Sequence, residues 1–138
     1  MKSVFVSIIL SSLLAVTGSV TADQNWSSTM QITPGAEILT MINVLTPAPE
    51  HKTKTANLLQ QGIDKEISKQ DGFVAATVHE SLDSNHIVVY AQWRDQDVLM
   101  AAAKKVKGGE APLMAEAYSL GNPDYHPYAV KATITKKD

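Results

Sequence analysis

Residues 86–107 constrain the fold more than any other stretch, because they read as a strand that passes directly into a helix. Alternate residues of a strand share a face. One predicted face carries Ile87, Val89, Ala91 and Trp93, and the other carries His86, Val88, Tyr90 and Gln92. Asp95 is a favoured N-cap residue for the helix, which is expected to end near Lys107. Trp93, at the end of the strand, is either core filling or the wall of a pocket beneath this helix.

The rest of the chain from Ala36 onward alternates between strand and helix patterns. Pro49 suits the first turn of a helix, Gly72 suits a helix stop, and Pro127 favours an edge or bulged strand. Besides the segment above, the patterns predict strands at 37–45, 73–82 and 125–135, an amphipathic helix at 50–69, and a short helix at 110–120.

The order of these elements predicts an α+β fold with the ferredoxin-like βαββαβ arrangement. Such a domain has a four-stranded antiparallel sheet with helices on one face. The strand at 37–45 is apolar on both sides, so the face without helices also needs cover. For a small domain without cysteine, we expect a homodimer packed sheet against sheet.

The N-terminus reads as a signal peptide. Lys2 is followed by an apolar run at 4–16, and small residues precede a predicted cleavage site after Ala22. The run is too short for a membrane span, which needs about 20 apolar residues. We therefore expect an exported protein, periplasmic or secreted, with a flexible leader at 23–35 and one domain at 36–138. An uncleaved anchor at the membrane surface is the alternative.

Composition excludes several classes of protein. The chain has no cysteine, so neither a disulfide framework nor a thiol nucleophile is available. The formal charge is −2 and the lysines are scattered, which is unlike a nucleic-acid-binding surface. No two histidines have the local spacing of a metal site, so we expect no metal.

Two polar residues stand out on otherwise apolar strands. Asn43 shares a predicted face with Leu39, Met41 and Leu45. A buried carboxamide needs partners, so Asn43 is either a satisfied structural residue or a group that projects into a cavity. His79 is a candidate base, because histidine ionises near neutral pH. The alternative for His79 is a solvated residue beside a turn.

The segment Val88-Val-Tyr90-Ala-Gln-Trp93-Arg94, together with Asp71-Gly-Phe73 and the strand that contains His79, resembles the antibiotic biosynthesis monooxygenase family. The resemblance covers about Leu39 to Val106, and the last strand more weakly. It implies a dimeric α+β barrel. In the turn before Phe73, Asp71 stands where the family usually has Pro.

The resemblance implies two kinds of chemistry. One branch of the family oxidises polycyclic phenols with O₂ and without metal or flavin; His79, Tyr90 and Trp93 match its polar set, whereas Val89 stands where that branch has Asn. A second branch degrades haem, and Asn43 and Trp93 match it. Ala103, Lys104 and Lys105 occupy the helix where its haem-binding His would lie.

The leading hypothesis is an exported, homodimeric monooxygenase, without cofactor, that oxidises an aromatic or quinol-like molecule with O₂. Trp93 and Tyr90 would border the site, Asn43 would orient the substrate oxygen, and His79 would act as the base. Because Tyr90 and Trp93 lie on opposite sides of an ideal strand, one pocket can hold both only if a bulge or barrel edge intervenes. The alternatives are a non-catalytic dimer that binds a small ligand, and a haem-handling protein.

Overall fold

The structure is a computed structural model that describes residues 30–137. The predicted signal peptide lies outside the described residues, as does the leader up to residue 29. None of the described helices is long and apolar enough to cross a membrane.

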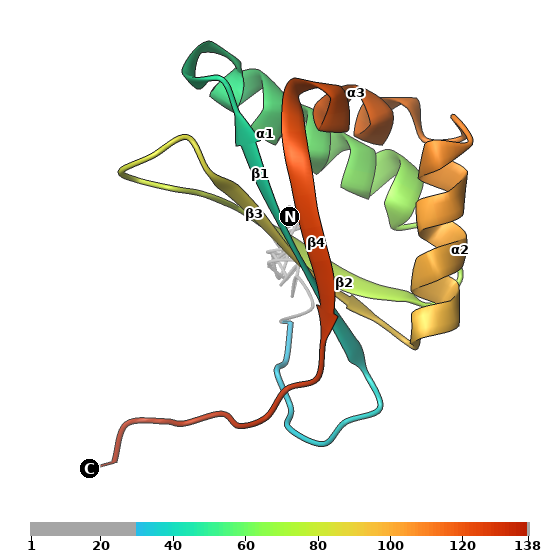
Figure 1. Cartoon of the computed structure of the whole chain (residues 1–138). Coiled ribbons are helices and arrows are strands. Elements are labelled where there is room, and N and C mark those ends of the chain that lie inside the picture. Colours follow the sequence, from blue (N-terminus) through green and yellow to red (C-terminus); the bar gives the residue numbers. More distant parts are fainter. Residues whose placement is uncertain (1–29, 138) are drawn as a thin grey trace, which may run out of the picture.

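The described chain forms one antiparallel sheet with helices on one face (Figure 1). The elements follow one another as β1 (Leu39–Pro47), η1 (Pro49–His51), α1 (Lys52–Gly62), η2 (Ile63–Ile67), β2 (Phe73–Glu80), β3 (Ile87–Trp93), α2 (Gln96–Lys107), α3 (Pro112–Leu120) and β4 (Gly121–Tyr128). The strands lie in the order β2-β3-β1-β4. This is the ferredoxin-like α+β arrangement that the sequence predicts.

The local signals in the sequence act as expected at three element ends. Pro49 begins the 3₁₀ turn η1, just before α1. Gly72 has a φ of +75°, a left-handed conformation that favours glycine, where the chain enters β2. The carboxylate of Asp95 accepts a hydrogen bond of 2.9 Å from the backbone N–H of Val98 and so caps α2.

The last strand differs from the prediction. β4 spans Gly121–Tyr128 rather than 125–135, and Gly121 pairs with Pro47 at its start. The strand ends where its partner does, because Tyr128 pairs with Thr40 and β1 begins at Leu39. As an edge strand, β4 tolerates Pro123 and Pro127, which cannot donate to a ladder.

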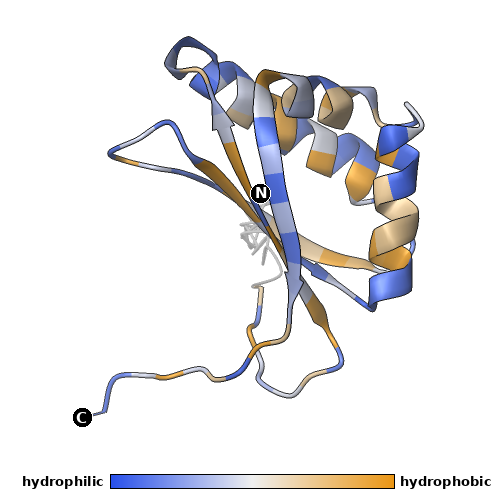
Figure 2. Cartoon of the chain, in the orientation of Figure 1, coloured by the Kyte–Doolittle hydropathy of each residue, from blue (hydrophilic) through white to orange (hydrophobic). Residues whose placement is uncertain are grey.

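Apolar residues of the sheet and the helices form one core between the two layers. Figure 2 shows hydrophobic residues in both layers. Ile87, Val89, Ala91 and Trp93 of β3 are all buried there, as the alternation predicts. From α1, Leu58 and Leu59 pack into the same core. The central β1 and β3 are therefore the floor of the core, and the three helices are its cover.

A β-bulge changes the pattern of faces in β2. The pairing with β3 shifts between Phe73 and Ala75, so Phe73 lies opposite Trp93 whereas Thr77 lies opposite Tyr90. Residues directly opposite one another share a face. Phe73 therefore faces the helices, and Thr77 and His79 face the other side of the sheet. Unbroken alternation along residues 73–79 would predict Phe73 and His79 on one face, and that prediction is wrong because of this extra residue.

Candidate functional site

An apolar cavity of about 250 Å³ lies between the sheet and its helical cover. Each of β1, β2, β3, β4, η2, α2 and α3 contributes to its wall. The lining residues are Met41, Ile63, Ile67, Phe73, Ala76, Val89, Ala91, Trp93, Leu99, Ala102, Ala103, Val106, Lys107, Met114, Tyr118, Pro123 and Tyr125. A concave apolar site with a few polar groups is the usual form of a small-molecule site.

Trp93 forms one end of the cavity. Its side chain is 2 % exposed and meets the ring of Phe73 edge-on, with ring centroids 5.4 Å apart. The indole N–H is buried and has no hydrogen-bond partner among the described residues. A buried donor without a partner costs free energy, which a hydrogen bond to an acceptor on a ligand would recover.

Asn43 and Tyr118 form a polar pair at the other end. Asn43 is fully buried, and its Nδ2 donates a hydrogen bond of 3.3 Å to the hydroxyl of Tyr118. The Oδ1 atom of Asn43 has no partner within the described part of the chain. The pair thus offers an unused acceptor on Asn43 and the hydroxyl proton of Tyr118, for which no hydrogen bond to a described residue is found.

Burial raises the pKa of Tyr118 to about 12, because the charged phenolate is poorly solvated there. The hydrogen bond from Asn43 acts in the opposite direction, and the nearby Tyr125 raises the pKa further. Tyr118 is therefore a neutral phenol at physiological pH. It can donate a hydrogen bond but cannot serve as a base.

Two close contacts fix α3 and thus Tyr118. The carboxylate of Glu66 accepts hydrogen bonds from the backbone N–H groups of Leu113 and Met114, at 3.0 and 3.1 Å. It supplies the N-terminal cap that Ala111 cannot. Gly62 lets α3 approach α1, because a Cβ there would lie 2.7 Å from the Sδ of Met114.

A π-helical turn shapes the adjoining wall. In η2, the backbone N–H of Ser68 donates to the carbonyl of Ile63 at 2.8 Å, a bond that spans five residues. Ile63 and Ile67 both line the cavity, and Glu66 between them reaches α3. The π-helical turn therefore places Ile63 and Ile67 at the cavity and Glu66 at the N-terminus of α3.

The register of the sheet sets the distance between the two ends. Trp93 lies opposite Leu39, whereas Asn43 lies four residues farther along β1. At about 3.3 Å per residue, the ends are separated by roughly 13 Å along the strand. Met41 and Ala91 form the apolar floor between them.

The structure does not bring His79 and Tyr90 to this cavity. Tyr90 lies on the face of the sheet without helices, where its hydroxyl is 3.3 Å from Oγ1 of Thr40. His79 is exposed on the same face and bonds to Thr77 at 2.8 Å. Tyr90 and Trp93 could share one pocket only with a bulge in β3, but the bulge lies in β2. Of the four predicted site residues, Trp93 lines the cavity and Asn43 touches it through Tyr118.

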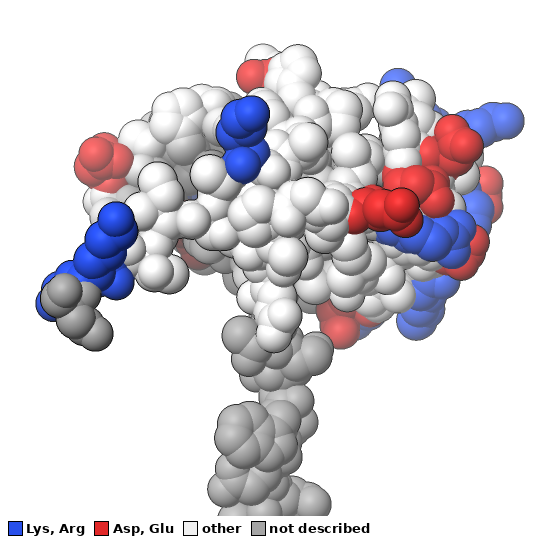
Figure 3. Space-filling view, turned by 90° about the horizontal axis from the view of Figure 1, so that it is seen from below, with Lys and Arg blue, Asp and Glu red and all other residues white. Residues whose placement is uncertain are grey.

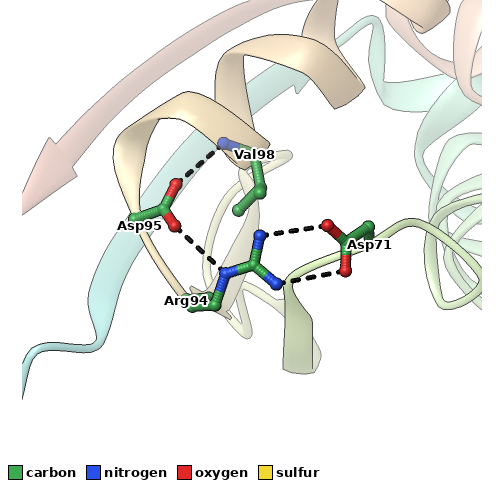
Figure 4. Close-up of polar contacts among 4 residues, drawn as sticks. All are labelled: Asp71, Arg94, Asp95 and Val98. Atoms are coloured by element: carbon green, nitrogen blue, oxygen red, sulfur yellow. Dashed lines mark hydrogen bonds and ion pairs between the residues drawn. The ribbon is translucent and has the colours of Figure 1, made fainter.

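An ion-pair network joins the turn before β2 to the start of α2 (Figure 4). The guanidinium of Arg94 binds both carboxylate oxygens of Asp71, at 3.1 and 3.0 Å, and its Nε binds Asp95 at 3.1 Å. The bond from Arg94 lowers the pKa of Asp71, and the helix N–H of Val98 followed by Arg94 lowers that of Asp95. Asp71 and Arg94 lie next to Phe73 and Trp93 in sequence, and these two aromatic residues line that end of the cavity. The network thus connects the two segments that carry them.

The donor set of the cavity is poor in metal ligands. No histidine or carboxylate lines it, and among residues 30–137 no group of three His, Cys, Asp or Glu side chains could hold a metal ion. Ala103 lines the cavity in the helix where a haem-degrading relative would carry its His. The residues present do not supply that axial ligand.

Sequence reasoning missed Tyr118, Tyr125 and Glu66. Tyr125 pairs with Asn43 in the β1–β4 ladder, and the sequence alone does not give the register of that pairing. A signal did exist for Tyr118, since Met114 and Tyr118 are four residues apart and share a helix face. Glu66 lies within the predicted helix at 50–69, and nothing in its residue type or spacing shows that it caps another helix.

The comparisons with known proteins agree with the fold. The antibiotic biosynthesis monooxygenase family matches residues 38–106. Tetracenomycin-F1 monooxygenase of Streptomyces glaucescens is 38 % identical over 65 residues, which are 47 % of this chain and 58 % of that protein. The chain thus spans a little over half the length of this relative.

Solved structures show the same architecture. SnoaB, a cofactor-independent oxygenase from Streptomyces nogalater, superposes with a TM-score of 0.61 at 20 % identity, over 73 % of this chain and 100 % of SnoaB. An anthrone oxidase-like protein superposes with a TM-score of 0.57 at 23 % identity, over 70 % of this chain and 40 % of that one. At these identities the likeness shows the fold alone. With half of its residues matched by the family and with this architecture, the chain belongs to the antibiotic biosynthesis monooxygenase family.

Proposed function

We propose that the protein is a monooxygenase that oxidises a small phenolic aromatic with O₂ in the cavity under the helices. The observation that carries this proposal is the apolar cavity itself, with the Asn43–Tyr118 pair at one end and Trp93 at the other. The similarity to tetracenomycin-F1 monooxygenase and the cofactor-independence of SnoaB support it.

The chemistry balances without an added reductant. A 1-naphthol (C₁₀H₈O) and O₂ give a 1,4-naphthoquinone (C₁₀H₆O₂) and water. One oxygen atom forms the new carbonyl, and the other takes two hydrogens from the substrate and leaves as water. The substrate supplies all the electrons that O₂ accepts, so neither flavin nor metal is required by the stoichiometry.

The proposed roles of the residues follow from their places. Tyr118 holds the oxygen of the substrate, Asn43 orients the hydroxyl of Tyr118, and Trp93 bounds the ring with its free N–H. His79, the predicted base, lies across the sheet, and no histidine or carboxylate lines the cavity. We therefore propose that the phenolic proton leaves to solvent, with the hydroxyl of Tyr118 donating to the oxyanion that remains.

Oxygen uptake tests the proposal. Wild-type protein is expected to consume O₂ with 1-naphthol above the uncatalysed rate, in the presence of a chelator, and to place one atom of ¹⁸O₂ in the quinone. Trp93→Phe should lower this rate at least about tenfold, which corresponds to about 1.4 kcal/mol. Tyr128→Phe, on the far face of the sheet, is the matched aromatic control. No uptake above the blank with 1-naphthol or its dihydroxy analogues would remove the enzymatic function.

A second candidate is a protein that holds an aromatic ligand without oxidising it. Val89 favours this candidate, because it is buried in the cavity wall where quinone-forming relatives carry Asn. Tight binding of 1-naphthol with no O₂ uptake is the result that this function predicts.

Haem handling is the third candidate, and Asn43 and Trp93 are its support. A haemin titration tests it: a Soret band that shifts on binding and is altered by Asn43→Ala would favour haem. An unchanged spectrum of free haemin would exclude it.

We also propose that the protein is exported and works as a homodimer. Both proposals rest on the sequence, namely the N-terminal apolar run and the apolar face of the sheet that lacks helices. The mass of the protein recovered from the periplasm or medium tests cleavage after Ala22.

A further inference from the structure

We propose that Tyr118 is the specificity-determining residue of the cavity, and that its hydroxyl donates to the oxygen of a phenol with one or two rings. The far edge of the bound ring system lies toward Trp93. This inference rests on the proposed function for the identity of the site, and it adds the ligand class, its orientation and the residue that selects it.

The hydrogen bonds around Tyr118 leave its proton for a ligand. The hydroxyl already accepts from Nδ2 of Asn43 at 3.3 Å. Asn43 is fully buried at the middle of β1, so it fixes the lone pair that accepts and thereby turns the O–H away from itself. Among the described residues no hydrogen bond from this hydroxyl is found, and apart from Tyr125 and Lys107 the rest of the cavity lining is mainly apolar.

The chemistry of Tyr118 suits a donor to a developing oxyanion. It stays neutral well above physiological pH, because burial disfavours its own phenolate. A hydrogen bond to a charged oxygen is roughly twice as strong as one between neutral groups, and more so in an apolar site. A ring without an oxygen at this end would leave the donor of Tyr118 unpaired.

The size of the cavity limits the ligand. An apolar cavity of about 150 Å³ is large enough to hold benzene. At about 250 Å³, this cavity accommodates two fused rings. Asn43 lies roughly 13 Å along β1 from Leu39, the residue that pairs with Trp93. This length leaves room for two fused rings.

Tyr118 is also held too firmly to adapt to another ligand. Glu66 anchors the first turn of α3, and Met114 one turn before Tyr118 packs on Gly62. Asn43 is therefore a positioning residue that acts through Tyr118, whereas Tyr118 itself touches the ligand.

Binding measured by calorimetry under nitrogen tests the proposal without turnover. We compare 1-naphthol with 1-methylnaphthalene, which has the same rings and no oxygen. Wild-type protein should prefer 1-naphthol by about five- to tenfold, the size of one hydrogen bond. In Tyr118→Phe the preference should vanish while the affinity for 1-methylnaphthalene stays unchanged, which also shows that the cavity has kept its shape.

The controls separate this role from a structural one. Tyr128→Phe should keep the wild-type preference, and Asn43→Leu should lower it about two- to fivefold by freeing the hydroxyl of Tyr118 to turn. If Tyr118→Phe does not fold, Asn43→Leu carries the test. A preference for 1-naphthol that survives in Tyr118→Phe would overturn the proposal, as would an undiminished preference in Asn43→Leu where that variant carries the test. Because no O₂ is present, a failure here is distinct from a failure of the oxygenase function.

Discussion

At the scale of single residues, Asn43 presents a conflict between stability and binding. The side chain is fully buried with an unpaired Oδ1, and its one hydrogen bond goes to Tyr118. An unsatisfied buried acceptor costs about 1–3 kcal/mol, whereas a typical hydrogen bond contributes about 1 kcal/mol. The free energy of unfolding alone would not favour Asn here, which points to a role in binding.

The conflict predicts the effect of Asn43→Leu on stability. Leucine has a similar size and removes the unsatisfied oxygen. We expect the free energy of unfolding in urea to stay the same or to rise by up to about 2 kcal/mol, while 1-naphthol binding weakens. A loss of more than about 1 kcal/mol would instead make Asn43 a structural residue, the other alternative that the sequence left open.

Single residues also show the limit of sequence reasoning. The alternation in β3 identified Trp93 and its buried neighbours, because one strand carries that information by itself. The placement of His79 failed, because the bulge after Phe73 inverts every later side chain of β2. No glycine or proline in 73–79 marks that bulge, because the nearest glycine, Gly72, lies before the strand.

At the scale of elements, α3 depends on a side chain from another element. Its own N-cap residue, Ala111, offers no side-chain hydrogen bond, and Glu66 of η2 caps it instead. The sequence predicted a helix at 110–120 from its pattern. It could not show the cap, because Glu66 is 47 residues away from Leu113.

Removal of this cap should loosen α3. We expect Glu66→Ala to lower the free energy of unfolding by about 0.5–2 kcal/mol, and to speed hydrogen exchange of the Leu113 and Met114 amides. Glu116→Ala is the control, because its ion pair with Lys54 is exposed and such a pair contributes about 0–1 kcal/mol. Equal losses in the two variants would contradict a capping role for Glu66.

The ion-pair network of Asp71, Arg94 and Asp95 should make the free energy of unfolding depend on pH in the acid range. The pKa of Asp71 and that of Asp95 are lowered in the folded protein, chiefly by Arg94 and by the N–H of Val98 respectively. Their stabilising contribution is thus present above the unfolded pKa of about 3.9 and is lost as the pH falls through the lowered values. Above pH 5 the contribution is complete.

Melting temperatures between pH 2 and pH 6 test this dependence. Wild-type protein should melt above Asp71→Asn at pH 6, and the difference should shrink as the pH falls below about 4. Added salt should reduce the difference at pH 6, because these groups are exposed. A difference that grows in acid would have the wrong sign for a lowered pKa.

At the scale of the whole molecule, one face of the sheet carries no helix. On β1 and β3 this face presents four partly exposed, uncharged side chains, namely Ile42, Val44, Val88 and Tyr90. Thr40 and Gln92 of the same face are buried, and Gln92 donates to the carbonyl of Gln31. Seen from below, the surface carries few charged groups, and these gather mainly toward the α2 side (Figure 3). The uncharged middle of this face suits a second copy packed against it, with the exposed Asp124 and His126 of β4 at its edge.

A charge at the centre of this face should prevent dimer formation. We expect light scattering after gel filtration to give a dimer for the wild type and a monomer for Ile42→Lys, since a buried unpaired charge is costly. Met100→Lys, on the exposed side of α2, should remain dimeric. A wild-type protein that stays monomeric at high concentration would contradict the proposed homodimer.

The methionines offer the most direct test of where the ligand binds. Met41 and Met114 line the cavity, and Met100 is exposed on α2. Met30 borders two hollows beside β2, one on the face without helices and one against α1. With ¹³C-labelled methionine methyl groups and 1-naphthol under nitrogen, we predict shifts of the Met41 and Met114 signals and contacts from both to the ring protons. Met30 and Met100 should not change. Ring contacts to Met30, with Met41 and Met114 unmoved, would place the ligand beside β2 and outside the cavity, and would contradict the site described for this protein.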